Sequence, residues 1–266
     1  MPRIPSRVSV GGAELAYRVV GDGPALLLIM GHTGSMDQWP LAVVNSLARD
    51  RRVIVYDHRG MGDSSSPPGE WTIEQLADDA AGLLASLGIA LTDVLGWSMG
   101  GLVAQELAFR HPGLVRRMVL VATSPGGSAA RRPDQAVLDV LHDDSIIGAE
   151  RGRRVWGLMV PQEFAEAFPA FIPEVARTRR AATRDDALRQ WRAIESWRGS
   201  WDLLPTLVIP VLLVTGTCDV VTPPDNSLRM AERIPGSWLV RMDGGGHGVI
   251  YQYPGRFTGV VRAFLE

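Results

Sequence analysis

The chain has 266 residues, a length that fits one large α/β domain with a substantial buried core. Hydrophobic residues make up 46%, charged residues 21%, and the formal net charge is only -2, so composition gives no support for binding to nucleic acid or to an anionic membrane. The single cysteine excludes an internal disulfide framework, and neither a secretory signal nor a bilayer-spanning apolar run is found. We therefore expect a soluble, cytoplasmic protein.

Strand-like and helix-like segments alternate along most of the chain. The expected strands are residues 14–20, 25–31, 53–57, 92–97, 118–122, 211–216 and 238–242. The expected helices are residues 38–48, 73–87, 99–110, 226–234 and 255–265. This alternation predicts a mostly parallel, doubly wound α/β sheet. The first two strands, joined through residues 21–24, are expected to form an antiparallel hairpin at one edge.

The alternation stops between about Ser124 and Pro205. That stretch lacks convincing strands, carries most of the tryptophans and shows helical apolar spacing at residues 136–141 and 187–197. We interpret residues 124–205 as a helical cap, or lid, inserted into a core made of residues 1–123 and 206–266.

The pentapeptide Gly-Trp-Ser-Met-Gly at residues 96–100 lies between an expected strand and an expected helix. A serine on such a sharp turn is held in a strained backbone conformation with its hydroxyl above the sheet edge. The flanking glycines are required because a β-carbon would collide with the neighbouring strand and helix. This pattern of a nucleophile elbow makes Ser98 the candidate covalent nucleophile.

A serine nucleophile needs a general base, and the base needs an orienting group. Asp219 follows the expected strand 211–216, and His247 follows the strand 238–242, so both side chains are predicted at the sheet edge that carries Ser98. No acidic residue follows the strand that ends at residue 122, the other place where the acid could stand, because the chain has Ser124 and Pro125 there. The remaining histidines lack the required loop position.

An acyl-transfer site also needs donors for an oxyanion. The backbone N–H of Met99 follows the nucleophile, and a second donor is expected from the backbone N–H of His32 in the loop after strand 25–31. Because that donor is a backbone group, we expect a change of the His32 side chain to do less damage than a change of Gly31.

With these residues in place, the sequence resembles the α/β-hydrolase superfamily over essentially the whole chain outside the cap. The stretch Asp-His-Arg-Gly-Met-Gly-Asp-Ser at 57–64 is similar to the Asp-x-Arg-Gly-x-Gly-x-Ser loop of that family, and Gly-Thr-Cys-Asp-Val-Val-Thr-Pro-Pro at 216–224 resembles the loop that carries its acid. Many members carry His-Gly where this chain has Met30-Gly31. That pair, with Trp39-Pro40 and Tyr56-Asp57-His58-Arg59, resembles methylesterases of anthracycline biosynthesis and, more loosely, enol-lactonases and cofactor-free haloperoxidases.

The resemblance implies a cofactor-independent serine hydrolase that cleaves a fairly apolar carboxylic ester or lactone, with no metal. Alternatives on the same three residues are carbon–carbon bond hydrolysis and haloperoxidase or perhydrolase chemistry. From other classes, a slow-turnover small-molecule receptor and a non-hydrolytic cyclase stay open. The oligomeric state is not predicted. Aromatic residues that are candidates to contact substrate are Trp97, Trp156, Phe168, Trp191 and Trp197.

Two further side-chain interpretations concern loops beside the site. Asp57 and Arg59 are expected to anchor their loop rather than to take part in chemistry. Cys218 is expected to be a small packed residue rather than a second nucleophile.

Overall fold

A computed structural model of the protein describes residues 4–143, 148–169, 171 and 182–266. Its centre is an eight-stranded sheet in the order β1-β2-β4-β3-β5-β6-β7-β8, in which every pair from β4 to β8 is parallel. The strands are β1 Ser6–Val10, β2 Ala13–Val20, β3 Ala25–Ile29, β4 Arg52–Tyr56, β5 Thr92–Trp97, β6 Val115–Val121, β7 Val211–Gly216 and β8 Trp238–Met242. The mostly parallel, doubly wound sheet is confirmed.

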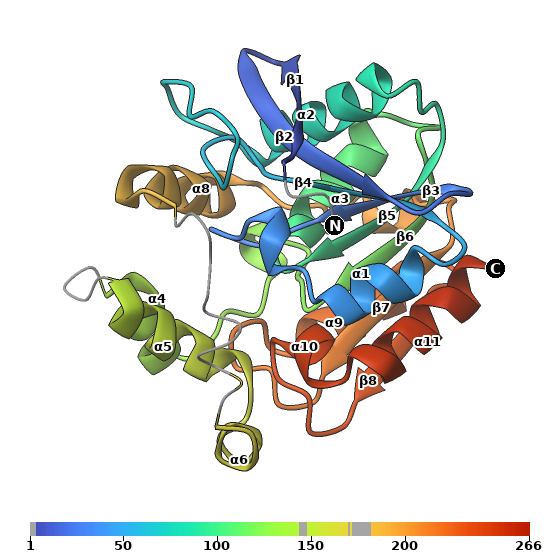
Figure 1. Ribbon diagram of the computed structural model, residues 1–266. Helices are drawn as coiled ribbons and strands as arrows, with labels where there is room; N and C mark the ends of the chain where they lie inside the picture. The colour runs from blue at the N-terminus through green and yellow to red at the C-terminus, as the bar shows by residue number, and fades with distance from the viewer. Residues whose placement is uncertain (1–3, 144–147, 170, 172–181) are drawn as a thin grey trace.

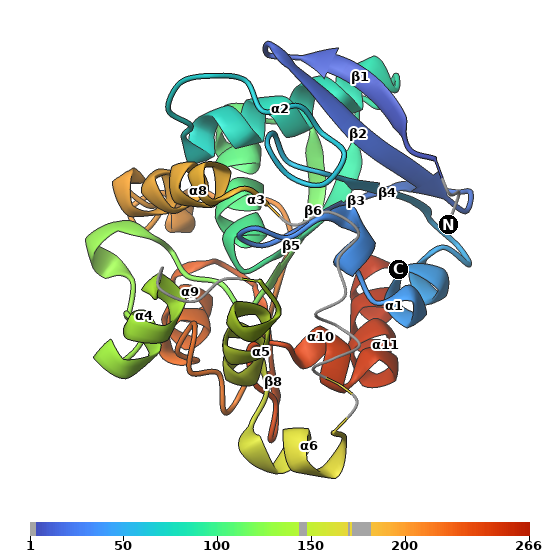
Figure 2. The same ribbon diagram turned by 60° about the vertical axis from the view of Figure 1, so that its left-hand side comes forward.

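Helices cover both faces of this sheet (Figures 1 and 2). The described helices are α1 Leu41–Leu47, α2 Ile73–Ser86, α3 Met99–Arg110, α4 Gln135–His142, α5 Gly148–Met159, α6 Gln162–Ala167, α8 Arg184–Ser196, α9 Asp225–Arg233, α10 Val249–Gln252 and α11 Pro254–Leu265. In both views α1 and α11 lie side by side on one face, and α2 and α3 lie on the other. The five helices expected from sequence periodicity are all present, with ends shifted by up to three residues.

The expected hairpin between residues 14–20 and 25–31 is wrong. β2 pairs antiparallel with β1 and with β4, whereas β3 pairs parallel with β4 and β5. The connection of β2 to β3 packs against the turn between α1 and β4: a β-carbon on Gly21 would lie 2.3 Å from Ala48 O and 2.6 Å from Arg51 O. The real hairpin joins β1 to β2 through Gly11 and Gly12, whose positive φ angles of 53° and 79° suit a two-residue turn.

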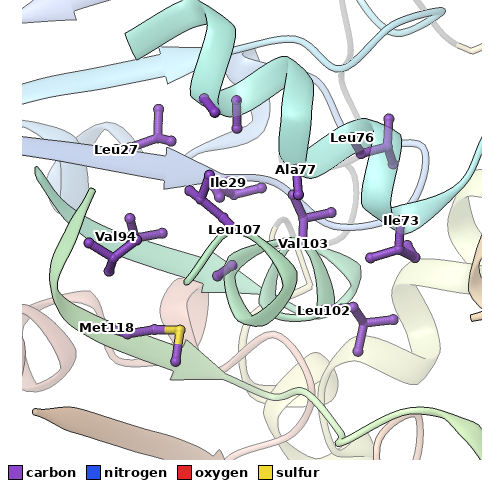
Figure 3. Packing of buried hydrophobic residues seen from close by; sticks show 14 of the residues in the cluster. Leu27, Ile29, Ile73, Leu76, Ala77, Val94, Leu102, Val103, Leu107 and Met118 are labelled. Carbon is purple, nitrogen blue, oxygen red and sulfur yellow. The ribbon is translucent and has the colours of Figure 1, made fainter. Parts of the chain in front are cut away.

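The core has two layers because alternate strand residues point to opposite faces. Leu27 and Ile29 face α2 and α3, while Leu26 and Leu28 face α1 and α11, and all four are fully buried. Figure 3 shows the first layer, where strand residues meet side chains of the two helices. A sheet buried on both faces fixes the strand ends, and so fixes the positions of the loops that leave them.

Four described helices, α4, α5, α6 and α8, lie between β6 and β7 in the chain. At the start and end of this segment the chain is tied together, because the Ser200 N–H donates to the carbonyl of Pro125 at 2.8 Å. The Ser200 hydroxyl also donates to Gln105 Oε1 of α3 at 2.6 Å, and Gln105 Nε2 donates to Ser124 O at 3.0 Å. Residues 144–147, 170 and 172–181 of the expected cap lie outside the described residues.

Among the described helices, none combines the length and apolar character that a membrane span would need.

Candidate active site

Ser98 sits between β5 and α3 with φ 57° and ψ −123°, a conformation that non-glycine residues rarely adopt. Close packing of the backbone explains both glycines of the pentapeptide. A β-carbon on Gly96 would lie 2.2 Å from Gly100 O, and one on Gly100 would lie 2.1 Å from Ile29 O. The Thr123 hydroxyl donates to Ser98 O at 2.8 Å, which ties this turn to the segment that follows β6.

Asp219 and His247 lie next to Ser98 in a continuous chain of hydrogen bonds. His247 Nε2 is 2.9 Å from Ser98 Oγ, and His247 Nδ1 is 2.9 Å from Asp219 Oδ2. Histidine and aspartate are both buried, whereas Ser98 is partly exposed. Asp219 Oδ1 accepts the backbone N–H groups of Val221 and Thr222, which fixes the carboxylate. With Nδ1 protonated, Nε2 can accept the serine proton.

Three residues hold the histidine loop, a role that the sequence did not predict for any of them. The Trp97 indole N–H donates to His247 O at 3.0 Å, so strand β5 braces the loop that follows β8. Gln252 Oε1 accepts the Gly246 N–H at 2.7 Å. The carbonyl of Met159, at the end of α5, accepts the Gly248 N–H at 2.5 Å, so a residue of the 124–205 segment contacts this loop directly.

The loop after β3 packs against the serine. A β-carbon on Gly31 would lie 3.1 Å from the β-carbon of Ser98, which brings this backbone beside the elbow. Met99 is the first residue of α3, where backbone N–H groups have no partner within the helix. The His32 ring Nε2 lies 2.9 Å from Ala187 O of α8, and the ring packs edge-on against Trp191 at 5.7 Å.

His58, two residues after the end of β4, supports the same loop. Its Nε2 lies 3.1 Å from the carbonyl of Met30, and its Nδ1 lies 3.4 Å from the Tyr56 hydroxyl. Burial lowers the pKa of His58 from 6.5 to about 4, so the ring is neutral near pH 7 and its Nε2–H donates to Met30 O. A side chain two residues beyond the end of β4 thus braces the start of the loop that follows β3.

Asp57 and Arg59 occupy anchoring positions. Asp57 accepts the backbone N–H groups of Met36 at 2.6 Å and Asp63 at 2.8 Å, and burial raises the pKa of this carboxyl from 3.8 to about 6. Arg59 makes a bidentate pair with Asp79, with both distances 2.7 Å and both side chains buried. Neither residue hydrogen-bonds to Ser98, Asp219 or His247.

The candidate aromatic residues lie in different surroundings. Trp97 and Trp156 are buried and both pack against Tyr251, with ring centroids 5.7 and 5.1 Å away. Trp191 contacts the rings of His32 and His142, and the Phe168 side chain is 57% exposed. Trp197 is buried, and its indole N–H donates to Glu106 at 3.0 Å. These contacts favour a packing role for Trp197.

Cys218 does not have the predicted environment, because its side chain is exposed rather than packed. The neighbouring Asp219 side chain is buried, whereas the Cys218 thiol faces solvent from a tight turn after β7. His111 lies 2.8 Å from Asp78, and His142 is exposed. Within the described ranges, no group of three histidine, cysteine or acidic residues is placed to hold a metal ion.

Comparisons with known proteins cover nearly the whole chain. A family profile described as alpha/beta hydrolase fold matches residues 24–145, and one described as TAP-like protein matches residues 194–266. A putative carbamate hydrolase RutD of Pseudomonas syringae pv. syringae is 31% identical, covering 92% of this chain and 95% of that protein. An uncharacterised protein of Mycobacterium tuberculosis is 30% identical, covering 97% of this chain and 80% of that protein.

Two solved structures agree with this assignment. The enol-lactonase from Burkholderia xenovorans superposes with a TM-score of 0.86 at 26% identity, covering 98% of this chain and 99% of that one. A thermophilic esterase from Thermogutta terrifontis superposes with a TM-score of 0.84 at 28% identity, covering 98% of both chains. The sheet order, the two family profiles and these near full-length relatives together show that the chain belongs to the α/β-hydrolase superfamily.

Proposed function

We propose that this protein is a serine hydrolase that cleaves a carboxylic ester or lactone of a small, fairly apolar molecule. The observation that carries the proposal is the unbroken chain Ser98 Oγ, His247 Nε2, His247 Nδ1 and Asp219 Oδ2, with 2.9 Å at each contact between residues. Membership of the α/β-hydrolase superfamily supports hydrolysis in general. The esterase and the enol-lactonase among the similar structures favour an ester or lactone bond.

The proposed reaction has two half-steps. Ser98 Oγ attacks the substrate carbonyl while His247 Nε2 takes its proton, and Asp219 stabilises the imidazolium that forms. The Met99 and His32 backbone N–H groups would donate to the tetrahedral oxyanion. His247 then gives its proton to the departing alkoxide, leaving an acyl group on Ser98. Water, deprotonated by the same imidazole, attacks the acyl-enzyme, and the returning proton regenerates the Ser98 hydroxyl.

We assign the choice of substrate to residues 124–205, the proposed cap. Aromatic rings form a contact series from Trp97 through Tyr251 to Trp156 and Phe171, and so connect the elbow with this segment. Their apolar surfaces suit an apolar acyl or ring group. No bound cofactor is needed for the proposed chemistry, and the soluble, cytoplasmic location stays a prediction.

Carbamate hydrolysis is the second candidate, favoured by the RutD relatives at 27–31% identity. A carbamate has the same kind of electrophilic carbonyl, so attack by Ser98 would follow the same route. The two candidates differ only in the group attached to that carbonyl.

A substrate panel with a covalent probe tests the proposal. Purified protein is assayed with p-nitrophenyl esters, aliphatic lactones and a p-nitrophenyl carbamate, and is treated with a fluorophosphonate. We expect ester or lactone turnover and labelling of Ser98. The Ser98→Ala variant should keep its unfolding temperature and lose turnover by roughly 10⁴-fold or more. Turnover retained by a pure Ser98→Ala preparation, or a wild type that the probe does not label, would overturn the mechanism.

A further inference from the structure

The loop proposed to bind the oxyanion is held from two sides. On the core side, His58 donates to Met30 O, and the Gly34 N–H donates to Gly31 O at 3.1 Å. Between these two contacts lie His32 and Thr33. Thr33 has a φ of 58°, and a β-branched residue adopts that left-handed region only when its surroundings keep it there.

Helix α8 supplies the contacts that hold this middle part. The Thr33 N–H donates to Gln190 Oε1 at 2.7 Å, and the His32 Nε2 lies 2.9 Å from Ala187 O. Gln190 is fully buried although it is polar. Ala187 and Gln190 lie one helical turn apart, so both contacts come from one face of α8. They fix the His32 side chain and the peptide bond that follows its Cα.

The placement of these contacts matters for the oxyanion. The N–H proposed as a donor belongs to His32, one residue before the N–H that Gln190 accepts. An oxyanion donor acts only when it is oriented before the charge develops. Without Gln190, the Thr33 N–H would lose its acceptor and the left-handed turn would lose one of its restraints.

We propose that Gln190 is a positioning residue for the oxyanion loop, so that the proposed cap supplies part of the geometry needed for catalysis as well as the substrate pocket. This inference rests on the proposed serine-hydrolase function. Gln190 acts through Thr33 and His32 and does not itself need to touch the substrate. The sequence separation of 157 residues between Thr33 and Gln190 means that the contact exists only when α8 is docked.

A purely structural role for Gln190, in docking α8 onto the core, predicts a different outcome. Other contacts of the same helix serve docking without touching residues 32 and 33. The Ser66 hydroxyl donates to Asp186 at 2.5 Å, and Arg192 pairs with Glu70 at 3.1 Å. Arg192→Ala therefore removes a docking contact of α8 and serves as the matched control for Gln190→Met, which keeps side-chain length and removes the acceptor.

The experiment measures kcat and KM separately on an ester that the wild type hydrolyses, together with inhibition by an alkylboronic acid. A boronic acid adds to a serine hydroxyl and forms a tetrahedral anion, so its affinity reports oxyanion binding. For Gln190→Met we expect kcat to fall roughly 10- to 100-fold, with KM within threefold and boronic acid affinity reduced by a similar factor to kcat. Arg192→Ala should stay within twofold of the wild type for all three quantities.

A second variant keeps the test decisive if Gln190→Met does not fold. His32→Ala keeps the backbone N–H and removes the contact with Ala187, and it should also lower kcat more than it raises KM. The inference is overturned if either folded variant has wild-type kcat, or changes KM alone, or if Arg192→Ala lowers kcat equally. Failure of the proposed function is separate, because it appears as absent turnover and absent fluorophosphonate labelling in the wild type.

Discussion

Asp57 and His58 are adjacent in the chain, both are buried, and their pKa values are shifted in opposite directions. The pKa of Asp57 rises from 3.8 to about 6, and that of His58 falls from 6.5 to about 4, in each case mainly through burial. Two backbone N–H donors oppose the shift of Asp57, and the Arg59 charge reinforces that of His58. Their effects on stability should therefore nearly cancel between pH 4 and 6.

The sign of each contribution follows from proton linkage. Folded protein binds more protons than unfolded protein at Asp57, so its favourable contribution is complete below pH 3.8 and is lost as pH rises through about 6. At His58 the folded protein binds fewer protons, so stability is present above pH 6.5 and is lost as pH falls through about 4. Each shift corresponds to about 3 kcal/mol of unfolding free energy.

Replacing either residue with one that cannot titrate should make that residue's own contribution visible in the difference between variant and wild type. His58→Gln keeps an amide donor near Nε2 and cannot titrate, so its unfolding free energy relative to wild type should rise by about 3 kcal/mol as pH falls from 7 to 4. For Asp57→Asn the relative free energy should change by about the same amount with the opposite slope. Loss of hydrogen bonds at Asp57 adds an offset that does not depend on pH.

Urea denaturation followed by circular dichroism at half-unit steps from pH 4 to 7 measures these differences. Subtracting the wild-type curve removes the titration of all other groups. Parallel slopes for the two variants, or a relative free energy for His58→Gln that is flat across this range, would refute the assignment of opposite shifts.

Two further predictions concern the elbow and the acid. Gly100→Ala places a β-carbon 2.1 Å from Ile29 O, a backbone atom that cannot move cheaply, so we expect a loss of about 3 kcal/mol or more in chemical denaturation, or insoluble protein. Gly259→Ala, at an exposed position of α11 where a β-carbon meets no atom within 4 Å, should instead gain up to about 1 kcal/mol, and equal behaviour of the two variants would contradict the argument. Asp219→Asn should lower kcat by roughly 10⁴-fold with an unchanged unfolding temperature. The Val221 and Thr222 N–H groups would hold the oxygen of the new amide, so its NH₂ group would face His247 Nδ1. That contact would leave the proton on Nε2, facing Ser98, and an Asp219→Asn variant with near wild-type kcat would exclude Asp219 as the orienting acid.

Sequence reasoning succeeded where the constraint is local. The glycines at 96 and 100 can be predicted from the close approach of a strand and a helix, and the side-chain periods identified seven of the eight strands. β1 was missed because Ser6–Val10 is a short edge strand with mostly exposed side chains and little apolar signal. The wrong hairpin has another cause: which strands are neighbours depends on where β4 inserts, and nothing in residues 14–31 reports that.

Within the candidate site, the residues that follow strands of the sheet could be predicted from the sequence, whereas the contacts made by the helical segment could not. Ser98, Asp219 and His247 each follow a strand of one parallel sheet, so chain order alone brings their loops to one edge. The contacts of Gln190 with Thr33, and of Met159 with Gly248, join a helical segment to these loops across long sequence separations. No periodicity or motif encodes them, because they depend on how α5 and α8 dock. If those contacts orient the two loops, as we propose for Gln190, variation in the segment between β6 and β7 would alter the turnover rate as well as the choice of substrate.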